Sequence, residues 1–178
     1  WVEAEDLFKQ AMALDANEPD VMLDYVRMLS STGRLKQSLG IAQKLRTQEP
    51  LVPLYSGLTA MTLQINGQYA ASIPILEAMP RDAFARNSGL ALAYAAAGRY
   101  GEAADVILTT QENNITRQSV EAAARLLRSA PNKASSPETL PALSAVFGFV
   151  YAYIGAYERY LDAPERRVAI RGGGDQTV

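Results

Sequence analysis

A turn signal that recurs along the chain is the feature that most constrains its fold. The pattern x-Gly-x followed by Leu or Tyr occurs at Gly33, 34 positions later at Gly67, 31 positions further at Gly98, and 57 positions beyond that at Gly155. A glycine so placed is typical of the left-handed residue that ends a helix. A spacing of 34 and then 31 positions between the first three glycines predicts stacked helix–turn–helix units, because one helical hairpin cannot bury its apolar face alone.

The segments between the turns have helical character. Alanine is the commonest residue and leucine the next, both strong helix formers, and alternating runs of β-branched residues are absent. Breakers such as Asn17-Glu-Pro, Glu49-Pro50 and Met79-Pro80 divide the chain into helices of about 12 to 15 residues. The sequence therefore predicts an all-α chain of helical hairpins.

The repeat units can be compared with a known pattern residue by residue. The clearest copy reads Leu90-Ala91-x2-Tyr94, then Gly98, Ala103 and Ile107. It resembles the tetratricopeptide repeat, whose pattern is W-x2-L-G-x2-Y, a turn, and A-x3-F. The resemblance implies an α-solenoid, a right-handed superhelix with a concave inner surface, and a role in protein–protein interaction.

The repeat spacing also predicts a domain organisation. Because the turn glycine of the first copy would precede Trp1, the chain is expected to begin in the middle of a repeat. The predicted parts are repeats over 1–112 (a half repeat 1–16, then 19–50, 53–80 and 84–112), an extra helix and polar loop over 116–137, a degenerate hairpin over 138–170, and a flexible tail over 171–178.

Three local predictions concern the C-terminal part. Asn114-Ile115-Thr116 is a formal glycosylation sequon, but we favour Thr116 as the cap of a helix over 116–129. A proline in the second helix of the last hairpin predicts a short helix over 157–161 and another over 164–170. The loop over 130–141 is long and polar enough to be mobile.

Composition argues against most familiar enzyme classes. The chain contains no Cys and no His, which removes thiolate nucleophiles, histidine bases and the usual zinc ligands. Its 17 basic and 19 acidic residues give a net charge of -2, without the basic excess that nucleic-acid binding needs. We therefore predict a non-enzymatic protein with no catalytic residue, no cofactor, no metal and no nucleic-acid partner.

The sequence also allows predictions about a membrane-spanning segment and about the cellular compartment. The longest uncharged stretch, residues 139–157, is diluted by proline, glycine and tyrosine, and we interpret it as a buried helix rather than a membrane span. The predicted location is the cytoplasm, and a missing N-terminus leaves export open.

The repeat pattern points a set of first-helix residues into the concave groove. Arg27 is the only cation among them, which argues against capture of a terminal carboxylate. The groove instead suits an amphipathic helix or an extended apolar segment. The candidate ligand-binding residues are Arg27, Met61, Gln64, Leu92, Phe149 and Tyr153.

Several occupants stay open at this point. The partner is a protein or peptide, the chain's own helix over 116–129, or a second copy in a homodimer. An alternative function also stays open, a regulatory repeat segment of a larger bacterial signalling protein, because the Ala-rich array is similar to the repeat regions attached to winged-helix regulators and adenylate cyclases.

Overall fold

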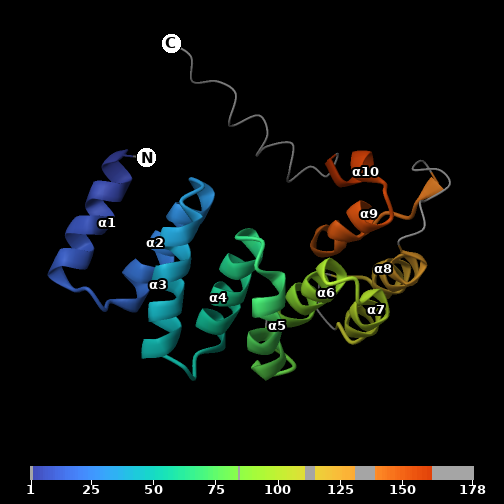
Figure 1. The fold of residues 1–178 in the computed structure, drawn as a ribbon, viewed down its shortest axis with the longest axis horizontal. Helices are drawn as coiled ribbons and strands as arrows, with labels where there is room; N and C mark the ends of the chain where they lie inside the picture. The colour runs from blue at the N-terminus through green and yellow to red at the C-terminus, as the bar shows by residue number, and fades with distance from the viewer. Residues whose placement is uncertain (1, 84, 111–114, 131–138, 162–178) are drawn as a thin grey trace, which may run out of the picture. The chain divides into compact units, whose positions relative to one another are not determined.

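The chain folds into α-helices that pack in chain order. The computed structural model describes residues 2–83, 85–110, 115–130 and 139–161, and within these ranges it contains helices and no strand, as the sequence predicts. It divides into two compact units, Trp1–Ala93 and Tyr94–Val178, each considered by itself below. The helices are α1 (Val2–Leu14), α2 (Pro19–Ser31), α3 (Leu35–Gln48), α4 (Pro53–Ile65), α5 (Tyr69–Ala78), α6 (Arg86–Ala96), α7 (Tyr100–Leu108), α8 (Arg117–Ser129), α9 (Phe149–Tyr153) and α10 (Tyr157–Leu161) (Figure 1).

The four repeated glycines form the turns that their spacing predicts. Gly33, Gly67, Gly98 and Gly155 have φ values of 77°, 74°, 74° and 76°, the left-handed conformation that side chains disfavour. After each glycine the next backbone N–H donates to the carbonyl five residues back, for example from Arg34 to Leu29 at 2.9 Å. This pattern is the Schellman motif, which satisfies the last carbonyls of the preceding helix. The turn prediction is confirmed.

Several helices are shorter than the sequence predicts. The helix α5 has 10 residues, α7 has 9 and α9 has 5. At the end of α5 the reason is Pro80, which excludes the helical conformation from the residue before it. Met79 accordingly adopts an extended backbone with ψ 152°.

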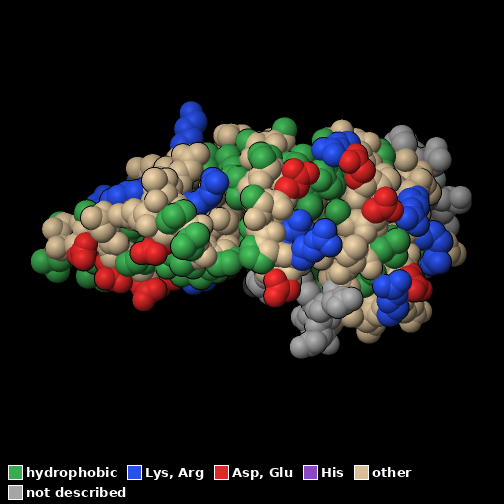
Figure 2. Space-filling model, turned by 90° about the horizontal axis from the view of Figure 1, so that it is seen from below, with side chains coloured by type: hydrophobic (Ala, Val, Ile, Leu, Met, Phe, Trp, Pro, Cys, Tyr) green, Lys and Arg blue, Asp and Glu red, His purple; other side chains and the backbone are tan. Residues whose placement is uncertain are grey.

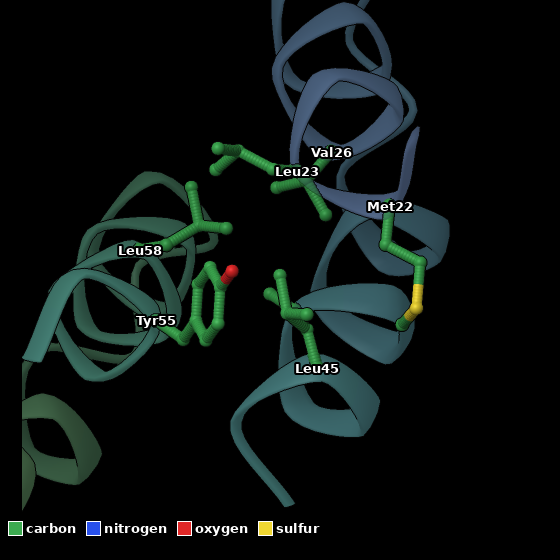
Figure 3. Close-up of a cluster of buried hydrophobic side chains, with 7 residues drawn as sticks. Met22, Leu23, Val26, Leu45, Tyr55 and Leu58 are labelled. Carbon is green, nitrogen blue, oxygen red and sulfur yellow. The ribbon is translucent and has the colours of Figure 1, made fainter. Parts of the chain in front are cut away.

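The core of the first unit lies where α2, α3 and α4 meet. Met22, Leu23 and Val26 from α2 pack with Ala42 and Leu45 from α3 and with Tyr55 and Leu58 from α4 (Figure 3). Buried hydroxyls join the same helices, since Ser38 Oγ donates to the Val26 carbonyl at 3.1 Å and Thr59 Oγ1 donates to the Ala42 carbonyl at 3.0 Å. These contacts hold the exposed faces of α2 and α4 side by side.

The first helix is attached more lightly. None of the described residues of α1 is fully buried, and Phe8 stacks on Tyr25 with ring centroids 5.1 Å apart. Glu5 forms ion pairs with Lys9 of the same helix and with Arg34 of the first glycine turn. Hydrogen bonds from these two cations, Lys9 first, lower the pKa of Glu5.

The second unit contains the helix that the repeat pattern left unexplained. Thr116 Oγ1 accepts a hydrogen bond from the Ser119 N–H at 3.2 Å, so α8 begins at Arg117 with Thr116 as its cap, as predicted. The helix packs against α7 and α9. Its apolar residues Val120, Ala123, Ala124 and Leu127 are buried. The apolar stripe of α8 is thus used within the second unit.

The C-terminal hairpin is shorter than a regular repeat. The helix α10 spans Tyr157–Leu161, as predicted, and is preceded by a 3₁₀ turn, Ala145–Phe147, and by α9. The stretch over 139–157 is therefore not the single buried helix that the sequence predicts. Its irregular start is held instead by Tyr151, whose hydroxyl donates to the Pro141 carbonyl at 2.6 Å and accepts from the Leu143 N–H at 3.0 Å.

Some predictions fall where the structure does not describe the chain. These are the sequon residue Asn114, residues 131–138 of the predicted loop, the helix over 164–170 and the tail over 171–178. Over the ranges that are described, none of the helices combines the length and the apolar character needed to cross a membrane.

Candidate functional site

One face of α4 carries a stripe of exposed apolar side chains. Leu54, Met61 and Ile65 are 51%, 43% and 47% exposed, and their spacings of seven and four positions place them on one side of the helix. The other large apolar residues of α4, Tyr55, Leu58 and Leu63, are buried. We call Leu54, Met61 and Ile65 the α4 stripe. Because α4 packs against α3 and α5, this side is the one it leaves uncovered.

The equivalent stripe of α2 is polar. Both helices begin at a proline, Pro19 and Pro53, so positions at the same distance from these prolines are equivalent. Asp20, Asp24 and Arg27 are exposed on this side of α2. Arg27 Nη1 donates to Asp24 Oδ1 at 3.0 Å, so the guanidinium already has a counter-ion. The only cation predicted to lie in the groove is therefore neutralised by its own helix.

The face of α6 is made of small and apolar residues. Leu92, the predicted groove residue on this helix, is partly exposed, as is Ser88 one turn before it. Gly89 lies against Leu76 of α5, and a Cβ added there would meet the two terminal carbons of Leu76 at 3.4 and 3.5 Å. The glycine thus lets Leu76 pack closely on the backbone of α6.

Gln64 has a different environment from Met61. Its side chain is buried, and its amide nitrogen donates to the Gly89 carbonyl at 2.8 Å and to Ser72 Oγ at 3.2 Å. The amide thus joins α4 to α5 and α6. This favours a structural role for Gln64 over the predicted contact with a ligand.

A signal for that role was present in the repeat spacing. In the first hairpin Ser30 Oγ lies 2.7 Å from Ser38 Oγ, and Gln64 and Ser72 occupy the same two positions of the next hairpin. In the third hairpin the equivalent positions are Ala95 and Ala103, both buried. The position of Gln64 therefore faces the second helix of its own hairpin in the first two copies and is buried in the third.

The two remaining predicted residues belong to the second unit. Phe149 is buried, and its ring makes an edge-on contact with Tyr153 at 6.2 Å between centroids. The ring of Tyr153 also contacts that of Tyr100 at 6.0 Å, and Tyr153 is partly exposed. These rings form an aromatic cluster between α7 and α9, in which Phe149 is a core residue.

Charged groups form local pairs rather than a field of one sign. On the face shown in Figure 2, basic side chains lie beside acidic ones in several places, with hydrophobic side chains between them. Arg99 pairs with Glu102, which lowers the pKa of Glu102. Within the described ranges, no group of three His, Cys, Asp or Glu residues is arranged to hold a metal ion.

Helices packed in consecutive pairs and joined by equivalent glycine turns define a helical-repeat protein of the α-solenoid class. Comparison with protein families gives the particular kind, since residues 1–61 match the family model described as tetratricopeptide repeat. Residues 1–61 are thus similar to tetratricopeptide repeats. Neither the curated proteins nor the solved structures contain a match to it. Tetratricopeptide repeats generally mediate protein–protein interactions, and the family is typically a non-enzymatic scaffold.

Proposed function

We propose that the first unit binds an apolar segment of a partner protein across the exposed faces of α2, α4 and α6. The observation that carries the proposal is the α4 stripe, in which three large apolar side chains are exposed to solvent on one side of a helix. Clustered apolar side chains on a folded surface are typical of protein-binding sites. Repeat arrays use their extended surfaces in this way.

The neighbouring helices support the choice of this face. Leu92 on α6 adds a partly exposed apolar side chain. Met61 suits the centre of such a site, because its unbranched side chain adapts to different partners. Arg27 remains a candidate contact at the α2 edge, where its charge is shared with Asp24. In the second unit, Tyr153 remains a predicted contact.

The test is selection of peptides from a random displayed library on the purified chain, followed by affinity measurement on the enriched sequences. The central variant is Met61→Glu, which places a charge in the middle of the α4 stripe. An apolar contact of this kind contributes about 1.5–3 kcal/mol when buried, so we expect at least about a tenfold loss of affinity.

The matched control is Leu51→Glu. Leu51 is 93% exposed in the turn before α4, so the same kind of substitution is made off the stripe. Both variants should keep the wild-type circular dichroism and denaturation midpoint. The proposal fails if selected peptides bind Met61→Glu as tightly as wild type, or if Leu51→Glu weakens them equally.

A further inference from the structure

We infer that the partner segment is an amphipathic helix whose flank over α2 carries Lys or Arg. This inference rests on the proposed function and adds the chemistry of the partner. The inference is based on a difference between two neighbouring helix faces. The α4 stripe is apolar, whereas the exposed side of α2 has an excess of carboxylates.

The two stripes lie side by side at matched positions. The helices α2 and α4 contact each other directly. Counted from the first proline of each helix, Asp20 on α2 corresponds to Leu54 on α4, and Arg27 corresponds to Met61. A ligand lying on the α4 stripe therefore has the polar side chains of α2 along one edge.

The charge on that edge is negative. Asp24 and Arg27 pair at 3.0 Å and cancel each other. Asp20 is exposed, and no ion pair to it is found among the residues that the structure describes. The sequence of α4 itself contains no charged residue. One uncompensated carboxylate thus stands next to an uncharged apolar surface.

The length of the α4 stripe favours a helix as the occupant. Leu54 and Ile65 are 11 positions apart, which is about 16 Å along a helix axis and about three turns. An amphipathic helix presents apolar side chains at matching i, i+4, i+7 and i+11 positions along the same length. A residue on its flank then reaches α2, as flanking charges do between paired helices.

Electrostatics selects the sign of that flank. A Lys or Arg there meets Asp20, whereas a Glu meets a like charge and gains nothing from the paired Arg27. An exposed ion pair is weak, so one carboxylate changes affinity by up to about fivefold. The effect is screened by salt.

The test compares two capped synthetic peptides of about 14 residues. Both carry Leu at i, i+4, i+7 and i+11 on an Ala-rich helix, and one has Lys at the flanking positions where the other has Glu. Affinities are measured at low and at high ionic strength for wild type, Asp20→Asn, Asp20→Lys and Met61→Glu. Asp6→Asn, an exposed carboxylate on α1, is the matched control.

We expect wild type to bind the Lys peptide several-fold more tightly than the Glu peptide at low salt, with the difference lost at high salt. Asp20→Asn should weaken the Lys peptide by about two- to fivefold, and Asp20→Lys should reverse the preference. Asp6→Asn should change neither. Thermal unfolding of each variant checks that the fold is kept.

Two results would overturn the inference in different ways. If both peptides bind equally and lose binding only in Met61→Glu, the apolar face is a binding site and the charge argument is wrong. If wild type binds neither peptide, or prefers the Glu peptide, the basic amphipathic helix is rejected. The library selection then decides separately whether the apolar face binds any protein segment.

Discussion

Replacing Gln64 by Leu distinguishes a structural side chain from a ligand contact. The amide nitrogen of Gln64 donates to the Gly89 carbonyl at 2.8 Å and to Ser72 Oγ at 3.2 Å. Leu has a similar volume, so the substitution removes these two hydrogen bonds without opening a large cavity. The result should therefore report the hydrogen bonds themselves.

The expected change in the free energy of unfolding depends on the hydrogen bonds that Ser72 and Gly89 retain in the variant. Ser72 Oγ still donates to the Tyr69 carbonyl at 2.7 Å. The Gly89 carbonyl lies inside α6, where the helix supplies its own backbone donor. Neither group is left wholly unsatisfied, so each lost bond costs about 0.5–1.5 kcal/mol, and the pair about 1–3 kcal/mol.

The assay is urea unfolding followed by circular dichroism, with Gln43→Leu as the matched control. Gln43 is exposed on α3, and the same substitution there should change the free energy of unfolding by less than about 0.5 kcal/mol. Peptide affinity, measured well below the unfolding midpoint, should be the same for Gln64→Leu and wild type.

The opposite pattern would refute this reasoning. If Gln64→Leu unfolds like wild type and like Gln43→Leu, the two hydrogen bonds do not stabilise the fold. If it also loses peptide affinity, Gln64 is the ligand contact that the sequence first suggested. A change in urea sensitivity without a change in midpoint would point to an altered unfolded state instead.

Three further predictions test the turns, the first helix and the cap. Gly33→Ala should destabilise the fold by about 1 kcal/mol, because Gly33 has a φ of 77°. Gly40 lies inside α3 with nothing within 4 Å of an added Cβ, so Gly40→Ala should stabilise the fold by about 0.5–1 kcal/mol. Equal effects of the two substitutions would contradict this reasoning. The lowered pKa of Glu5 stabilises the fold above the pKa of the unfolded chain, and this contribution is lost as pH falls through the folded pKa. The protection of the α1 amides, that is, the intrinsic exchange rate divided by the observed rate at the same pH, should therefore fall in acid, and Glu5→Gln should abolish that pH dependence. Thr116→Ala should cost about 0.5–2 kcal/mol and fray the start of α8 in amide exchange, a result that an unchanged exchange pattern would exclude.

Local sequence was sufficient to predict the structure where a single residue determines the backbone conformation or the start of a helix. A glycine tolerates the left-handed conformation that ends a helix, so the positions of Gly33 and Gly67 predict two turns directly. A threonine before a helical run caps that run through its own hydroxyl, so the start of α8 was also predictable. The first and last residues of each helix depend in addition on interactions with residues a few positions away in the chain.

Side-chain burial was not predictable in the same way. Met61 and Gln64 lie three positions apart on α4, and the repeat pattern assigns both to the groove, but one is 43% exposed and the other is buried. The difference arises because Gln64 is turned far enough around the helix to meet Ser72 and Gly89. Phe149 likewise becomes a core residue of the second unit, in contact with the ring of Tyr153.

The sequence by itself determined the helical class, the repeat spacing and the glycine turns, because these follow from propensities and backbone conformations that act within a few residues. The tertiary structure decided which side of each helix is exposed to solvent. That side is set by the neighbours on which the helix packs, and for α4 it leaves Leu54, Met61 and Ile65 uncovered beside the carboxylates of α2.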